Sequence, residues 1–200
     1  MIISTALINT ALDYAAYRTL IDTLLLEGKV TGPEQSEDLN HYTSLNVHRM
    51  NRVDKTSVIS EELNESLSQI KLPQTWLVIT EGWCGDAAQI IPFFHVIEKQ
   101  FPTISLKFVL RDENLELMDN FLTNGGRAIP KLLILDQKTN ELLAHWGPRP
   151  AEAQAVINNL KAANATMEEM KEKLHLWYGR NKGQALQVEL IALTKGLVNN

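Results

Sequence analysis

The stretch TEGWCGDAAQIIP, residues 80–92, contains the only cysteine of this 200-residue chain. It overlaps the short β-rich run TWLVIT (75–80), which is too short for a helix and suits a buried strand. From Asp86 to Gln100 the apolar residues recur at helical spacing, which predicts a helix. Cys84 is therefore expected between a strand end and a helix start, where free N–H groups and the helix dipole favour a thiolate.

The residues around Cys84 leave its role open. Free cysteine is often only a small buried hydrophobe. Gly85 permits a tight strand-to-helix turn and the close approach of another backbone. Asp86 either stabilises the helix start, the interpretation we favour, or acts as a local acid or base, and its charge opposes a thiolate. Ala87 occupies the position of the second thiol of a dithiol mechanism, so another molecule would have to resolve a mixed disulfide at Cys84.

The pattern along the chain predicts three parts: a helical N-terminal extension over 1–72, an α/β domain over 73–163 and a helical C-terminal extension over 164–200. The predicted helices cover 11–27, 34–50, 56–70, 86–100, 112–122, 150–163, 166–178 and 183–198. The predicted strands cover 75–80, 104–110, 131–136 and 141–147. The order β-α-β-α-β-β-α in the middle part predicts a mixed sheet covered by helices on both faces.

Composition narrows the function classes. The net charge of −5 and the absence of a Lys/Arg-rich run argue against a nucleic acid or an acidic membrane as partner. One cysteine excludes an intrachain disulfide framework, and the histidines show no metal-ligand spacing, so we expect no metal and no cofactor. No apolar run approaches ~18 residues and no basic segment precedes the N-terminal helix. We therefore expect a soluble protein of a reducing cytoplasm.

Three prolines and one arginine complete the set of candidate residues. Pro92 lies inside a predicted helix and should kink it. Pro130 begins a strand after the loop NGGR, and local evidence favours a trans Ile129–Pro130 bond because only a minority of X–Pro bonds are cis. Arg149, in the rigid loop WGPRP that ends at Pro150, either holds an anion or is solvated, and the solvated interpretation is slightly favoured.

Taken together, these features resemble the thioredoxin superfamily over roughly residues 73–163. Trp83-Cys84-Gly85 matches the Trp-Cys-Gly that begins the family's active site, and Pro92 matches the proline in its active-site helix. Within the superfamily, TEGWCGDAAQ together with WGPRP resembles a bacterial thioredoxin-like subfamily with a helical N-terminal extension.

The second half of the resemblance lies around the last two strands. Ile129–Pro130 in AIPKLLIL matches the segment whose cis-proline faces the catalytic sulfur, and Gly147 matches the glycine that closes the last strand. Two positions depart from the family pattern. Ala87 replaces the resolving cysteine, and Val78 stands where thioredoxins have a buried aspartate that assists proton transfer.

The resemblance implies site residues. Cys84 would be the nucleophile with Asp86 beside it, and Pro130 would be cis. The substrate groove would be formed by Trp83, Gly85, Ile129, Pro130 and Arg149.

Three functions remain open. In the first, our working hypothesis, Cys84 exchanges with a disulfide-containing or peptide-like protein partner, or with a low-molecular-weight thiol, and an external thiol completes the cycle. In the second, the domain is a non-catalytic interaction module whose groove binds extended peptide and whose extensions contact the partner. In the third, Cys84 is a redox sensor that forms a sulfenic acid or an intermolecular disulfide.

Overall fold

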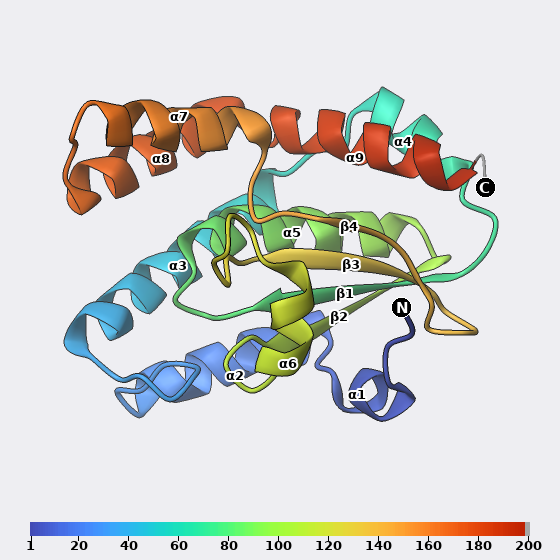
Figure 1. Cartoon of the computed structure of the whole chain (residues 1–200), viewed down its shortest axis with the longest axis horizontal. Coiled ribbons are helices and arrows are strands. Elements are labelled where there is room, and N and C mark those ends of the chain that lie inside the picture. The colour runs from blue at the N-terminus through green and yellow to red at the C-terminus, as the bar shows by residue number, and fades with distance from the viewer. Residues whose placement is uncertain (199–200) are drawn as a thin grey trace.

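A four-stranded mixed β-sheet forms the centre of the computed structural model, which describes residues 1–198 (Figure 1). The strand order is β2-β1-β3-β4. β1 runs parallel to β2 and antiparallel to β3, and β3 runs antiparallel to β4. The strands are β1 (Gln74–Thr80), β2 (Ile104–Leu110), β3 (Lys131–Asp136) and β4 (Leu142–Trp146). The predicted mixed sheet is confirmed.

Helices precede, interrupt and follow the sheet. The N-terminal segment contains α1 (Thr5–Thr10), α2 (Tyr14–Leu26), α3 (Glu37–Thr56) and α4 (Glu61–Ser68). Between the strands lie α5 (Gly85–Gln100), α6 (Leu115–Met118) and a 3₁₀ turn (Asp119–Phe121). After β4 come α7 (Ala151–Ala162), α8 (Met167–Asn181) and α9 (Gln184–Val198), and the last two residues of the predicted C-terminal extension, 199–200, lie outside the described residues.

Several helices differ in their bounds from the sequence prediction. The helix expected over 34–50 covers Glu37–Thr56, and the one expected over 56–70 covers Glu61–Ser68, because the side chains of Ser36 and Ser60 cap them. The helix expected over 11–27 begins at Tyr14, because the side chain of Asp13 accepts a hydrogen bond from the Ala16 amide and caps it. The helix expected over 112–122 is only one α-turn followed by the 3₁₀ turn. The short α1 was not predicted as a separate helix.

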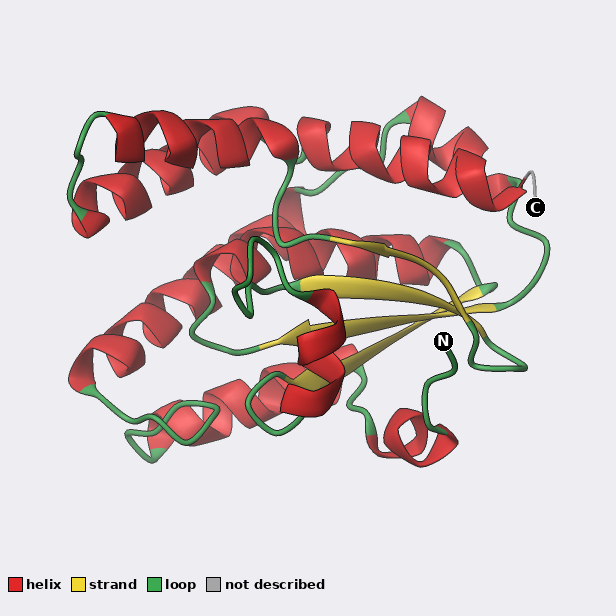
Figure 2. Cartoon of the chain, in the orientation of Figure 1, coloured by secondary structure: helices red, strands yellow, loops and turns green. Residues whose placement is uncertain are grey.

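Helices cover both faces of the sheet, as Figure 2 shows. On one face, Phe94 of α5 makes edge-to-face contacts with Trp76 and Trp146. Successive strand residues point to opposite faces, so His145, next to Trp146, faces the other side, where it contacts Phe121 of the 3₁₀ turn. The two faces are therefore covered by α5 and by the α6 region.

The terminal segments pack into the same hydrophobic core. Tyr17 of α2 stacks on Phe108 of β2, with ring centroids 4.9 Å apart. Leu63 and Leu67 of α4 are fully buried, and α4 lies beside α9 in Figure 1. α3 and α8 reach the end of the sheet at which α5 begins, where residues of both helices lie beside Cys84 and Gly85. No helix among residues 1–198 is long and apolar enough to cross a membrane.

Two cis peptide bonds, Ile129–Pro130 and Gly147–Pro148, lie at that same end of the sheet. Gly147 has a φ of +114°, and a Cβ atom there would collide with the carbonyl oxygen of Pro130. Only glycine therefore fits at the end of β4. Pro92 lies inside α5, which continues as a helix to Gln100, and the kink expected there stays a prediction.

Candidate functional site

Cys84 lies at the N-cap of α5, directly after the turn that follows β1. Its side chain is buried, with 8% of the residue exposed. The sulfur donates a hydrogen bond to the carbonyl oxygen of Ile129, at 3.3 Å, and Ile129 immediately precedes the cis-proline Pro130. The thiol thus connects the start of α5 to the segment before β3, although Cys84 and Ile129 are 45 residues apart in sequence.

The surroundings of Cys84 keep its thiol protonated. Burial and, to a smaller extent, the charge of Asp86 raise the pKa of Cys84 to about 12, although the backbone N–H groups of Ala87 and Asp86 act in the opposite direction. The helix start was expected to favour the thiolate. The pKa of Cys84 is instead raised, because removing the thiolate from water costs more free energy than its hydrogen bonds to the two N–H groups return.

Both carboxylate oxygens of Asp86 have side-chain partners. Its Oδ2 accepts from Nη2 of Arg149 at 2.6 Å and from Nε at 3.1 Å, and its Oδ1 accepts from the hydroxyl of Tyr178 at 2.6 Å. Asp86 lies in the first turn of α5, where its stabilisation of the helix start stays a prediction, whereas the solvated interpretation of Arg149 is wrong. Burial and the charge of Asp86 raise the pKa of Tyr178, so its hydroxyl keeps the proton that it donates.

The glycine after Cys84 is explained by a histidine of α8 rather than by a backbone. A Cβ atom at Gly85 would lie 2.9 Å from both Cε1 and Nε2 of His175. Nδ1 of His175 also lies 3.3 Å from the side-chain nitrogen of Gln89, one turn further along α5. Gly85 thus allows α8 to pack against the first turns of α5.

A cavity of about 350 Å³ opens above Cys84. All but one of the predicted site residues line it: Trp83, Cys84, Gly85, Asp86, Ile129 and Arg149. Pro130 is not among the lining residues. Trp83 is fixed in this wall, because its Nε1 donates to the carbonyl oxygen of Thr31 at 3.2 Å and the guanidinium of Arg111 lies 4.8 Å from its ring centroid.

The remaining walls come from segments that the sequence did not assign to the site. Arg49 lies on α3, Arg127 in the loop before β3, and Lys171 and His175 on α8. Nothing in their local sequence separates them from ordinary surface residues. For Tyr178 a weak signal exists, since the four-residue spacing of Met170, Leu174 and Tyr178 marks the buried face of α8.

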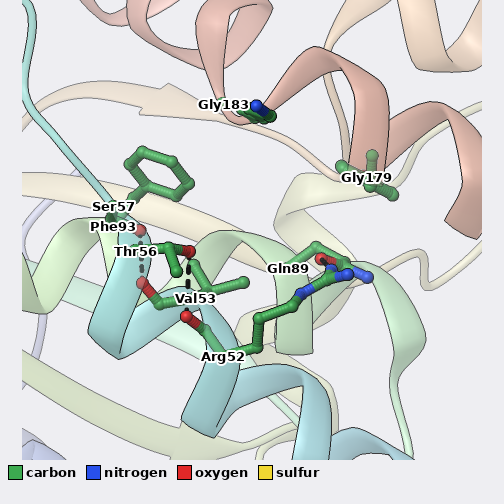
Figure 3. A pocket seen from close by; sticks show the side chains of 10 residues that line it. Arg52, Val53, Thr56, Ser57, Gln89, Phe93, Gly179 and Gly183 are labelled. Atoms are coloured by element: carbon green, nitrogen blue, oxygen red, sulfur yellow. Dashed lines mark hydrogen bonds between the residues drawn. The ribbon is translucent and has the colours of Figure 1, made fainter.

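A second cavity, of about 300 Å³, lies between the end of α3, α5 and the turn from α8 to α9 (Figure 3). In Figure 3 the side chain of Arg52 reaches toward Gln89, and Nη2 of Arg52 donates to Oε1 of Gln89 at 3.1 Å. Gln89 in turn contacts His175, which lines the first cavity. The two cavities are thus joined by side-chain hydrogen bonds. Within residues 1–198 no group of His, Cys, Asp or Glu side chains could hold a metal ion.

The sheet, the helix that begins at Cys84 and the cis-proline opposite it define a thioredoxin-like protein with a single thiol. A family model described as thioredoxin matches residues 32–175. The chain belongs to this thioredoxin family. No curated protein matches the chain.

Two solved structures resemble the chain over nearly its whole length. One is the 1.5 Å crystal structure of a protein of unknown function from Pseudomonas aeruginosa, with a TM-score of 0.62, 19% identity, and 98% of this chain and 99% of that chain covered. The other is an HIV epitope scaffold, with a TM-score of 0.60, 20% identity, and coverage of 97% and 99%. At this identity the likeness shows the fold, including helical segments on both sides of the central domain.

Proposed function

We propose that this chain is a thioredoxin-fold binding protein, in which the cavity above Cys84 holds a peptide-like segment of a protein partner without reducing it. The observation that carries the proposal is the hydrogen bond from the Cys84 thiol to the Ile129 carbonyl oxygen. Burial raises the pKa of Cys84 to about 12, so at neutral pH the sulfur carries the proton that this bond requires. The thiol is therefore in its unreactive form in the conformation that forms the cavity.

The other groups that a thioredoxin would use are also committed or missing. Ala87 has no thiol with which to resolve a mixed disulfide, and it is buried in the first turn of α5. Asp86 is bonded to Arg149 and Tyr178 and has no oxygen left without a partner to act as a base. These features favour binding over turnover.

The test measures how fast iodoacetamide alkylates Cys84 as a function of pH. Because Cys84 is the only cysteine, total alkylation followed by mass spectrometry reports this one sulfur. We expect the folded protein at pH 7 to react at least tenfold more slowly than the same protein unfolded in urea, in which the thiol regains its ordinary pKa. Fast alkylation with a midpoint below that of a free thiol would overturn the proposal.

Monothiol exchange is the second candidate, and one observation favours it: the backbone N–H groups of Asp86 and Ala87 are directed at the sulfur and offset part of the rise that burial causes in the pKa of Cys84. In this reaction the Cys84 thiolate attacks a disulfide, forms a mixed disulfide and releases the other sulfur as a thiolate. An external thiol then attacks the substrate sulfur of the mixed disulfide, and Cys84 leaves as a thiolate. The substrate now carries a disulfide to the external thiol, and a second external thiol reduces that disulfide and releases the substrate thiol. Fast alkylation in the test above would support this function.

We also propose the finer assignment to a bacterial branch of the family with a helical N-terminal extension. It is supported by α1–α4, which precede β1, and by the WCGDA sequence at residues 83–87. A cytoplasmic location belongs to the same proposal, since a single thiol suits a reducing compartment.

A further inference from the structure

The cavity above Cys84 is strongly cationic, although the chain as a whole carries a net charge of −5. Among the described residues 1–198, its only acidic lining residue is Asp86. Its cationic lining residues are Arg49, Arg111, Arg127, Arg149 and Lys171. A concave site lined by one sign of charge concentrates the field and attracts ligands of the opposite charge.

Three of these five cations already have a carboxylate partner. The ion pairs are Arg111–Asp112 at 2.8 Å, Arg127–Asp119 at 2.6 Å and Arg149–Asp86 at 2.6 Å. Within residues 1–198, Arg49 and Lys171 take part in no ion pair: Arg49 donates to the side-chain oxygen of Asn46, and Nζ of Lys171 lies 3.7 Å from the ring centroid of Tyr42. The two remaining cations lie on the helices that form the outer walls, α3 and α8.

The histidine in the cavity wall responds to this charge. The pKa of His175 is lowered to about 4 by burial, by Arg49 and Arg52, and by Lys171. His175 is therefore neutral at pH 7 and adds no charge of its own. An anion bound among these cations would offset them and would raise the pKa of His175.

Apolar and aromatic side chains alternate with the cations. Leu39, Tyr42, Trp83 and Ile129 also line the cavity. A volume of about 350 Å³ admits a few residues of a peptide or a small molecule rather than a folded surface. A bare inorganic anion would leave the apolar wall unused, whereas a short peptide carrying both acidic and apolar side chains contacts both kinds of wall.

We infer that the partner segment held above Cys84 is acidic, and that Arg49 of α3 and Lys171 of α8 bind its carboxylates. The inference rests on the proposed function, because it names the chemistry of the partner for the same cavity. It also assigns a role to the terminal helices, which supply the two cations that lack a carboxylate.

The experiment measures fluorescence polarisation of two labelled probes, a short peptide that alternates Glu and Leu and its Gln–Leu counterpart. Each is titrated with the wild-type chain and with Arg49→Gln/Lys171→Gln. Lys173→Gln/Arg180→Gln is the matched control, because it removes the same charge from exposed positions of α8 that do not line the cavity. We expect the wild type to bind the acidic probe at least tenfold more tightly than the neutral one.

The cavity variant should lose about tenfold in affinity for the acidic probe and the control variant less than threefold, since charges outside the cavity are screened by salt. Any of three results would overturn the inference: equal binding of both probes, equal losses of affinity in the two variants, or no binding of the acidic probe. Equal binding of both probes that is blocked by alkylation of Cys84 would leave the proposed binding function standing. Fast alkylation of Cys84 would remove that function whatever the peptides do.

Discussion

The guanidinium of Arg149 holds the carboxylate of Asp86 through two hydrogen bonds, of 2.6 and 3.1 Å, and so ties the loop after β4 to the first turn of α5. Cys84 lies immediately before this turn, and Ala87 follows Asp86 within it. Asp86 is 7% exposed and Arg149 20% exposed, so the pair is largely removed from water. This ion pair fixes the position of the loop relative to the thiol and keeps a negative charge beside the sulfur.

Asp86→Asn should therefore change both stability and thiol chemistry. It leaves the Arg149 cation without its counter-charge in a partly buried place, and we expect the free energy of unfolding to fall by about 2 kcal/mol. The pKa of Cys84 should also fall, because the charge of Asp86 is one of its causes. Urea denaturation measures the first effect, and the pH profile of iodoacetamide alkylation measures the second.

Asp38→Asn is the control for Asp86→Asn, because Asp38 is an exposed acid in the first turn of α3. It should cost less than about 0.5 kcal/mol. Tyr178→Phe removes the other partner of Asp86, and its cost should not add to that of Asp86→Asn. Additive losses in the double variant would mean that Tyr178 stabilises the fold independently of the carboxylate.

His175 should make the fold sensitive to mild acid. Its pKa is about 4 in the folded chain and near 6.5 when unfolded, so between these values the unfolded state binds the extra proton. The contribution of His175 is thus fully present above pH 6.5 and is lost as the pH falls to about 4, by about 2 kcal/mol. We expect the difference in unfolding free energy between the wild type and His175→Gln to shift by this amount from pH 7 to pH 4.5.

The difference between variants is needed because carboxylates also titrate in this range. His48→Gln, which replaces an exposed histidine of α3, provides the matched comparison. If His175→Gln behaves like His48→Gln, His175 is not held neutral by burial and the surrounding cations.

Gly147→Ala should be severely destabilising. The φ of +114° is unfavourable for alanine, and the new Cβ would meet a backbone oxygen, that of Pro130, which cannot move without displacing β3. We expect a loss of at least about 3 kcal/mol in urea denaturation. Gly126→Ala is the comparison, since its nearest neighbour lies at 3.5 Å and its φ is not positive, and it should cost less than about 1 kcal/mol.

The elements that could be predicted from the sequence are those whose signal is local. The strands 104–110 and 131–136 were predicted with the observed bounds, because each is a short apolar run ended by charged or turn residues. The helix over 112–122 was predicted too long. Its sequence pattern is helical, but the α-helix ends at Met118. A 3₁₀ turn follows, and then an isolated β-bridge pairs Thr123 with Gly126.

The site residues with a local sequence signal could likewise be predicted, and those that depend on tertiary packing could not. Trp83, Cys84 and Ile129 were identified from motifs, and the structure brings them together around one cavity. The protonated state of Cys84 could not be predicted, because the helix-end effect is visible in sequence whereas desolvation depends on everything packed around the sulfur. Arg149 was predicted in the groove, but its bonds to Asp86 and those of Tyr178 could not be predicted, since only tertiary packing places a loop and α8 beside Asp86.

Ala87→Cys tests how far the chain is from a dithiol reductase. The new thiol would stand at the third residue after Cys84, in the first turn of α5, where it could attack a mixed disulfide. With thioredoxin reductase or glutathione supplied, we expect disulfide-reduction activity no higher than background for both the wild type and Cys84→Ser. Activity should rise in Ala87→Cys if self-resolution is the limiting step.

The size of that rise separates the two functions. Ala87 is almost fully buried, so Ala87→Cys must first be shown to unfold at nearly the wild-type urea concentration. If the folded Ala87→Cys variant stays inactive, the buried, protonated Cys84 limits the reaction, and Asp86→Asn in the same background should raise the rate because it lowers the pKa of Cys84. If wild-type activity is already high and depends on an external thiol, Cys84 works as a monothiol nucleophile and the binding proposal fails.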